Sequence, residues 1–435
     1  MKVFIDTYGC QMNVYDGELV TGLLLSDGFG ITQEAEDADV ILINTCSVRD
    51  HAEQRALGRL RSLGALKRKQ PHLVLGVLGC MAERMQETIL KTAPDVDLIA
   101  GPDSYRQLPE IIRKHLNGSF GKFSIVPGDA GEDFTDIMPS RGNGINAYMA
   151  IMRGCNNYCS YCIVPHVRGR ERSRHPDDII IEIERSVEEG FPEVTLLGQN
   201  VNSYKWSDLG FHELLDRVSR VSGLKRIRFL TSHPRDLSEE LIERMVMGGN
   251  ICPSLHLPVQ AGSDRILKLM KRRYTRSEYV SKIHKLREAV PDIAITTDLL
   301  CGFPGETEND FQQTLDLIGE VRFDDAFTFK YSPRPGTAAA AMEDDVPEAE
   351  KVERLERMIA LCRKYSDNSR KEMIGREVEV LMESVSPKNA SEWTGRTGCG
   401  RVTLVPGAYK QGQLVRLKVE KVLGFSLWGN PVLTV

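Results

Sequence analysis

Three closely spaced cysteines carry the strongest chemical signal in this sequence. The stretch MRGCNNYCSYCIVP places Cys155, Cys159 and Cys162 in a C-x3-C-x2-C spacing. A compact loop of this kind can wrap three thiolates around one metal cluster, and thiolates are the usual protein ligands of iron–sulfur clusters. Three ligands on a 4Fe–4S cube leave one iron open to a substrate or cofactor. The alternatives are inert buried thiols or a structural zinc site with His166 as fourth ligand, although zinc sites usually use two C-x2-C pairs.

Three further cysteines are distant in sequence but follow similar segments. Cys10, Cys46 and Cys80 come directly after VFIDTYG, VILINT and LVLGVLG, with separations of 36 and 34 residues, about one strand–helix unit each. The carboxyl ends of parallel strands meet at one edge of a sheet, where ligands usually bind, so we expect these thiols to converge. Three separate buried cysteines remain the alternative. The other cysteines have no paired spacing and are expected to be structural: Cys252, Cys301, Cys362 and Cys399.

The elements that position these cysteines are expected in three regions. Strand and helix patterns alternate up to about residue 116, including a charged helix from Val48 to Lys69, which predicts a Rossmann-like parallel sheet covered by helices. Residues 117–146 read as a linker because they contain Gly121, Pro127 and other Gly and Pro residues without apolar periodicity.

The second region begins at about residue 147 as another alternating series. Right-handed crossovers between its strands would give a partial TIM-type (βα)6 barrel. The expected strands are 147–152, 193–198, 226–231, 254–257, 293–300 and 326–331, with a charged helix at 348–371. The third region has period-2 apolar patterns between Gly and Pro turns, which predict a small all-β barrel with strands at 378–382, 401–405 and 414–422.

Composition limits the possible settings of this chain. The 435 residues contain no run of about 18 apolar residues, so no membrane span is expected. Ten cysteines without a signal-peptide pattern are not read as a disulfide framework, and a cytoplasmic location is the expectation. The net charge of −5 gives no global footprint for nucleic acid, so any RNA contact must come from local basic patches.

A C-x3-C-x2-C loop after the first strand of a partial barrel resembles the radical S-adenosylmethionine (SAM) superfamily. In addition, TYGCQMN, INTCSVR and LGCMAER resemble the first domain of the methylthiotransferase family, and the β-rich tail resembles its TRAM domain. The resemblance implies a methylthiotransferase domain at 1–118, a linker at 119–143, a radical SAM domain at 144–371 and a TRAM-like RNA-binding domain at 372–435. It also implies two 4Fe–4S clusters, one on each cysteine set, and SAM as cofactor.

Within this family the sequence is most similar to the MiaB type. GQNVNSY and IVPHVRGRERSRHP carry that similarity. The type implies methylthiolation of carbon 2 of N6-isopentenyladenosine next to the tRNA anticodon, with sulfur delivered through the auxiliary cluster. Two alternatives share the chemistry and act on a ribosomal-protein aspartate or on N6-threonylcarbamoyladenosine in tRNA. An alternative of another class is a non-catalytic iron–sulfur RNA-binding protein.

Further site residues are expected at the barrel mouth and on basic segments. Resemblance suggests that Tyr161, before the third cysteine of its loop, packs near the adenine of SAM. Segments at strand ends, where barrel active sites form, add cofactor-site candidates: Gln199, Ser232, Gln260 and Glu306. Alternate arginines in an extended segment would place four guanidinium groups on one face suited to phosphates: Arg168, Arg170, Arg172 and Arg174. In the β-rich tail, Trp393, Arg396 and Arg401 are candidates for stacking on or pairing with RNA.

The resemblance also implies partners. These are the tRNA anticodon stem-loop, an electron donor of the flavodoxin or ferredoxin type, and a carrier of sulfur or for cluster repair. The sequence does not single out catalytic residues beyond the cluster ligands.

Overall fold

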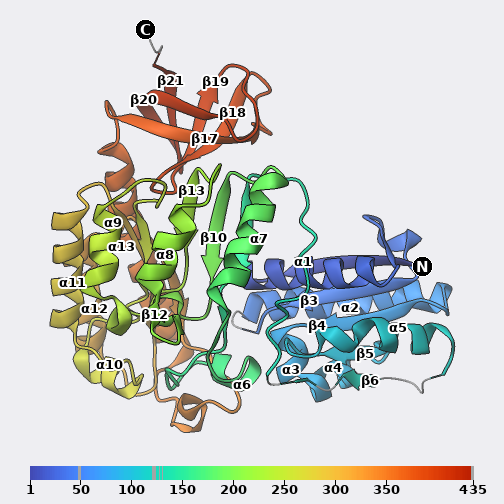
Figure 1. Cartoon of the computed structure of the whole chain (residues 1–435). Coiled ribbons are helices and arrows are strands. Elements are labelled where there is room, and N and C mark those ends of the chain that lie inside the picture. Colours follow the sequence, from blue (N-terminus) through green and yellow to red (C-terminus); the bar gives the residue numbers. More distant parts are fainter. Residues whose placement is uncertain (48–49, 120–123, 127, 130, 433–435) are drawn as a thin grey trace.

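A computed structural model describes residues 1–47, 50–119, 124–126, 128–129 and 131–432 of the chain. It contains a parallel sheet domain, a partial barrel and a small closed β-barrel in chain order (Figure 1). The predicted α/β architecture is therefore confirmed. No helix of the described residues is both long and apolar enough to cross a membrane.

The first domain is one six-stranded sheet in which every neighbouring pair is parallel, with strand order β2-β1-β3-β4-β5-β6. Its strands are β1 (Lys2–Tyr8), β2 (Gly30–Ile31), β3 (Val40–Thr45), β4 (Val74–Leu78), β5 (Leu98–Ala100) and β6 (Ser124–Val126). Separate apolar clusters cover the two faces of the sheet. They involve α1 (Gln11–Ser26), α2 (Asp50–Lys69), α4 (Gln86–Thr92) and α5 (Leu108–Leu116), while the short α3 (Cys80–Arg84) follows β4.

Some expected positions are outside the described residues, and the expected linker differs from the prediction. Val48, the expected first residue of α2, lies outside the described residues, as do Gly121 and Pro127 of the expected linker. The segment at 119–143 contributes β6 to the sheet edge. It also buries Phe134 and Ile137 in the core of the first domain, so this segment is packed against the sheet domain.

The central region contains six parallel strands in two groups of three, β13-β10-β7 and β14-β15-β16. A parallel bridge between Ile227 and Ile251 connects the groups. The strands are β7 (Asn146–Ala150), β10 (Glu193–Leu197), β13 (Arg226–Phe229), β14 (Ser254–His256), β15 (Ala294–Cys301) and β16 (Asp325–Lys330). The helices are α6 (Val164–Val167), α7 (Pro176–Glu188), α8 (Phe211–Ser219), α9 (Glu239–Val246), α10 (Asp264–Leu269), α11 (Arg276–Ala289), α12 (Glu308–Val321) and α13 (Glu348–Lys371). Two short ribbons pair β8 (Met152–Arg153) with β9 (Arg172–Ser173) and β11 (Lys205–Trp206) with β12 (Leu209–Gly210).

The C-terminal region forms a closed five-stranded barrel, which we call the β-module, with order β17-β18-β19-β21-β20. Its strands are β17 (Glu377–Val385), β18 (Glu392–Thr397), β19 (Val402–Pro406), β20 (Leu414–Leu423) and β21 (Ser426–Pro431). Arg226 at the start of β13 donates to the carbonyl oxygens of Arg396 and Glu379 at 2.6 and 3.0 Å. The β-module therefore sits at the amino-terminal end of the barrel strands, opposite α6 (Figure 1).

Candidate active site

The C-x3-C-x2-C loop lies between β8 and α6, at the carboxyl end of the first barrel strand. Cys155 and Cys159 are buried, and Cys162 is partly buried. The loop is anchored to the barrel because the amide of Ser160 donates to the carbonyl of Met270 at 3.0 Å and its hydroxyl to the carbonyl of Leu269 at 2.8 Å. The structure thus holds three thiols in one short, well-fixed loop.

The three distant cysteines come together at one edge of the first sheet. Tyr8 of β1 pairs with Thr45 of β3, so Cys10 and Cys46 follow strands that end in register. Cys46 hydrogen-bonds to Cys10, and Cys80 lies close enough to Cys10 for the charge of Cys10 to raise the pKa of Cys80. Cys10 and Cys46 therefore lie together at this sheet edge with Cys80 near them, and their joint binding of one cluster stays a prediction.

Two glycines permit this close approach of the strand ends. A side chain at Gly9 (φ +127°) would place its Cβ 2.5 Å from the Cβ of Cys46. A side chain at Gly79 (φ +88°) would place its Cβ 2.6 Å from Oδ1 of Asn44. Both positions have left-handed φ angles, which glycine adopts without steric cost. The Gly-Cys pairs in TYGCQMN and LGCMAER thus have a structural reason.

A pair of buried asparagines braces the same edge. Nδ2 of Asn44 donates to the carbonyl of Asn13 at 2.7 Å, and Nδ2 of Asn13 donates to Oδ1 of Asn44 at 3.2 Å. The thiol of Cys10 donates to Oδ1 of Asn13 at 3.2 Å. These contacts fix β3 against the start of α1 and orient the first thiol.

The thiols differ in acidity because their surroundings differ. The hydrogen bond with Cys46 is the largest influence on Cys10 and lowers its pKa below the usual range, and the charge of Arg168 acts in the same direction. Burial raises the pKa of Cys80 and Cys155 and raises that of Cys162 to about 12. Those three are neutral thiols in the chain without a bound metal group, and binding such a group would release their protons.

Each cysteine set offers the type of donor that a 4Fe–4S cluster uses. Among the described residues, no three His, Cys, Asp or Glu side chains converge closely enough to share one metal ion. The thiolates of a 4Fe–4S cube each bind a different iron and therefore need not converge on one point. An arginine N–H faces a sulfur in each set: Nε of Arg168 donates to Sγ of Cys80 at 3.1 Å, and Nη1 of Arg272 donates to Sγ of Cys159 at 3.4 Å.

Three of the cofactor-site candidates present unpartnered polar atoms, and two of these, Gln199 and Ser232, follow strands at the barrel mouth. Gln199 follows β10, and its Oε1 is buried without a hydrogen-bond partner among the described residues. Ser232 follows β13, and its Oγ is also buried without a hydrogen-bond partner among the described residues. Such atoms are unfavourable unless another group satisfies them. Tyr161 is partly buried against the apolar cluster around Leu267, and Gln260 joins β14 to β15 through a bridge with Leu299.

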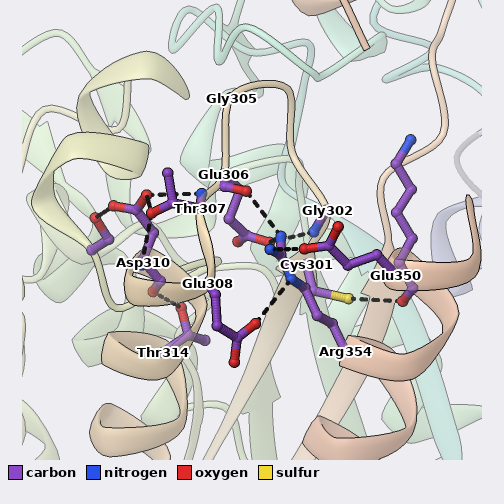
Figure 2. A network of polar contacts seen from close by, with 12 residues as sticks. Cys301, Gly302, Gly305, Glu306, Thr307, Glu308, Asp310, Thr314, Glu350 and Arg354 are labelled. Carbon is purple, nitrogen blue, oxygen red and sulfur yellow. Dashed lines mark hydrogen bonds and ion pairs between the residues drawn. The ribbon is translucent and has the colours of Figure 1, made fainter. Parts of the chain in front are cut away.

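Glu306 has a well-defined protein partner instead of facing an open site. Its Oε2 accepts hydrogen bonds from Nη1 of Arg354 at 2.9 Å and from the amide of Gly302 at 2.6 Å (Figure 2). Burial raises the pKa of Glu306 to about 7, although Gly302 and Arg354 oppose the shift. Arg354 also pairs with Glu350 of its own helix, so this network ties the end of β15 to α13. One oxygen of Glu306, Oε1, remains buried without a partner among the described residues.

The expected face of four arginines does not form, and that prediction is wrong. Arg168 and Arg174 are buried, 4% and 3% exposed, and pair with Asp16 at 2.7 Å and Glu182 at 2.7 Å. The chain reverses at Gly169, which has a φ of +70°, so the segment is not extended throughout.

The other two arginines of this segment have different surroundings. Arg172 pairs with Asp103 of the first domain at 2.8 Å. Arg170 is exposed. The run therefore serves mainly as a connection between the first domain and the barrel, and it leaves one arginine for solvent or RNA.

A cavity of about 650 Å³ lies inside the barrel. Inward-facing side chains of the strands line it, including Tyr148, His256 and Phe327, and Phe327 is 50% exposed. Gln11, next to Cys10, and Arg396 of the β-module also line this cavity. Both flanking domains thus border the interior of the barrel.

Comparison with known proteins identifies the family. A protein of Parabacteroides distasonis named tRNA-2-methylthio-N(6)-dimethylallyladenosine synthase is 48% identical over 99% of this chain and 95% of its own length. A protein of the same name from Porphyromonas gingivalis is 46% identical over 100% of this chain and 95% of its own. The chain belongs to the tRNA-2-methylthio-N(6)-dimethylallyladenosine synthase family.

Family models match the three structural regions of this synthase-family chain. The Radical SAM superfamily model matches residues 149–318, and the TRAM domain model matches residues 371–432. The model described as uncharacterized protein family UPF0004 matches residues 2–101. Membership of the radical SAM superfamily implies one 4Fe–4S cluster and SAM.

Solved structures support the fold of the synthase family. The radical S-adenosylmethionine methyltransferase TsrM from Kitasatospora setae superposes with a TM-score of 0.61 at 14% identity, covering 78% of this chain and 77% of that one. This similarity concerns the arrangement of the chain and not its substrate.

In this synthase-family chain, the RNA-binding candidates of the β-module have unequal exposure. Arg396 is 46% exposed at its side chain and pairs with Glu383 at 2.8 Å. Trp393 packs edge-on against Tyr409, with ring centroids 6.4 Å apart. Arg401 is largely buried and pairs with Asp324 of the barrel at 2.6 Å, so it attaches the β-module to the barrel.

Sequence reasoning missed several residues that shape the site. Asp16, Asn13 and Asn44 are fully buried polar residues beside the first cysteine set, and Arg354 is a buried arginine of the barrel. Asn13 belongs to TYGCQMN, so an asparagine three residues after a cysteine was a usable signal. The others become recognisable only when residues distant in sequence meet in space.

Proposed function

We propose that this protein attaches a methylthio group to carbon 2 of N6-dimethylallyladenosine (isopentenyladenosine) next to the tRNA anticodon. One observation carries the proposal: Cys80 of the first cysteine set packs against the segment that directly follows the C-x3-C-x2-C loop, across the contact between the first domain and the barrel. Cys80 packs with Ile163 and Val167, which follow Cys162 closely in the chain. Two metal-binding sets so placed suit a reaction that needs both a radical source and a sulfur source.

The cysteines would divide these tasks. Cys155, Cys159 and Cys162 would hold the 4Fe–4S cluster that, with SAM, supplies radical chemistry able to activate an unreactive aromatic C–H bond. Cys10, Cys46 and Cys80 would hold a second 4Fe–4S cluster as the source of sulfur. Its support is the convergence of these thiols at one sheet edge and the buried arginine hydrogen bond to Cys80.

The SAM-site residues are assigned from their burial and from their unpartnered polar atoms. Gln199 and Ser232 have unpartnered atoms that SAM would satisfy. Tyr161, Gln260 and Glu306 are the further SAM-site residues we propose, with Glu306 acting through its second carboxylate oxygen. The barrel cavity would receive the modified base.

RNA would contact side chains of the segment after α6 and of the β-module that are exposed or partly exposed. Arg170, Trp393 and Arg396 are the residues we assign to this contact, and the β-module, as a TRAM domain, suits the anticodon stem-loop. We also propose domain limits at 1–118, 144–371 and 372–435, joined by 119–143. The reaction would take place in the cytoplasm, with a flavodoxin- or ferredoxin-type electron donor and a carrier that restores sulfur or the cluster.

Nucleoside analysis of tRNA from a strain that lacks this gene tests the proposal. We expect N6-dimethylallyladenosine to accumulate without its 2-methylthio group, and the full-length gene to restore that group. Persistence of the 2-methylthio group, in a strain with no second enzyme of this type, would contradict the assignment. Loss of the group from N6-threonylcarbamoyladenosine, or of a modified ribosomal-protein aspartate, would redirect it to those substrates.

A further inference from the structure

Arg168 connects the two cysteine sets. It follows α6, close behind the C-x3-C-x2-C loop, yet its side chain reaches the first domain. Nε donates to Sγ of Cys80 at 3.1 Å, and Nη2 donates to Oδ2 of Asp16 at 2.7 Å. The side chain is 4% exposed, so both contacts are made away from solvent.

The buried positive charges around Arg168 outnumber the buried negative ones. Asp16, fully buried, is shared between Arg168 and Arg153, whose Nη2 lies 3.0 Å from Oδ1. Nη1 of Arg168 and both Nε and Nη1 of Arg153 are buried without hydrogen-bond partners in the described part of the chain. The neighbouring pair of Arg172 and Asp103 balances its own charge. Two buried guanidinium groups with one carboxylate are unfavourable unless an anion completes the set.

A cluster on Cys10, Cys46 and Cys80 would be that anion. Three thiolates outweigh the positive charge of an oxidised 4Fe–4S cube, so the bound group is negative. We propose that Arg168 is a positioning residue that holds this cluster through Cys80 and raises its reduction potential. A nearby positive charge and a hydrogen bond to a ligand sulfur both favour the reduced, more negative cluster. This inference rests on the proposed function, because it requires the second cluster.

Arg272 provides an internal comparison. It is buried, and its Nη1 donates to Sγ of Cys159 at 3.4 Å. Its other nitrogens donate to the hydroxyl of Tyr274 and the carbonyl of Pro258. Arg272 belongs to the same domain as its cysteine, whereas Arg168 crosses from the barrel to the first domain. The potential of the auxiliary cluster therefore depends on the contact between the two domains.

Potentiometric titration followed by electron paramagnetic resonance tests the proposal. The full chain carries alanine at Cys155, Cys159 and Cys162, so that only the first-domain cluster contributes, and it is reconstituted anaerobically with iron and sulfide. We expect Arg168→Gln to lower the reduction potential because a positive charge is lost. Asp16→Asn should raise it because a negative charge is lost. Arg170→Gln, two residues away and exposed, is the matched control and should leave the potential unchanged.

Opposite shifts in Arg168→Gln and Asp16→Asn would support the electrostatic role, since a merely structural role gives no such change of sign. Equal potentials in all variants with full iron content would overturn this inference and leave the proposed function intact. If Arg168→Gln loses its iron, Asp16→Asn decides: a raised potential supports the proposal, and an unchanged one refutes it. Failure of the parent chain to bind iron would overturn the second cluster and this inference together.

Discussion

Replacement of Arg174 and Arg170 separates a structural arginine from an RNA-binding one. Arg174 is 3% exposed, pairs with Glu182 at 2.7 Å and donates to the carbonyl of Ala150 at 2.8 Å. Removal of one partner from a buried ion pair costs roughly 3–5 kcal/mol. Glu182 retains Arg141 at 2.6 Å, so we expect Arg174→Gln to cost about 3 kcal/mol, at the lower end of that range.

Hydrogen exchange measures this loss locally. A cost of about 3 kcal/mol corresponds to roughly 100-fold faster exchange of amides that open with the contact between α1 and β7. Arg170→Gln should leave this exchange unchanged, because surface substitutions usually alter stability by less than about 0.5 kcal/mol.

The salt dependence of RNA affinity tests whether Arg170 contacts RNA. If Arg170 contacts one phosphate, its replacement should reduce the slope of log affinity against log salt by about 0.7–0.9. Arg174→Gln should leave the slope unchanged. A variant of Arg174 with normal exchange but a reduced slope would refute our account of its burial.

Three further predictions concern the site. Cys10→Ala should reduce bound iron from about eight to about four per chain and abolish sulfur insertion while 5′-deoxyadenosine still forms, whereas Cys252→Ala should keep about eight irons; equal iron in both variants would contradict the ligand assignment. Gln199→Ala should raise the KM for SAM about fivefold at unchanged iron content, as expected for one lost hydrogen bond of about 1 kcal/mol, and an unchanged KM would remove Gln199 from the SAM site. Burial raises the pKa of Glu306 from 4.5 to about 7, so its ionisation between these values destabilises the folded state as pH rises. The effect of Glu306→Gln on the melting midpoint should therefore be more favourable at pH 8 than at pH 4.5, and the reverse order would show that the Arg354 ion pair prevails.

Regular topology made much of the fold predictable. The convergence of Cys10, Cys46 and Cys80 follows from strands of a parallel sheet, because their carboxyl ends share an edge whatever lies between them. The order of the six barrel strands follows from the same alternation of strands and helices. Strands β18 and β21 were missed because EWTGRT and SLWGNP contain glycine or proline and lack a clear period-2 pattern.

Buried charge was the main feature that the sequence concealed. Alternating arginines suggested a solvent-exposed face, but the partner of Arg168 is Asp16, 152 residues earlier in the chain. Local pattern cannot reveal such a pair, since only the packing of the first domain against the barrel brings its members together. The unpartnered oxygen atoms of Gln199 and Ser232 likewise could not be predicted, because burial and missing partners are properties of the folded chain.

The most direct test of the central claim is reconstitution of the reaction with purified components. The anaerobically reconstituted full chain is mixed with SAM, a low-potential reductant and a tRNA anticodon stem-loop that carries N6-dimethylallyladenosine, and the nucleosides are then analysed by mass spectrometry. We predict conversion to the 2-methylthio nucleoside together with release of 5′-deoxyadenosine. Unmodified nucleoside from a chain that carries about eight irons and cleaves SAM would contradict it.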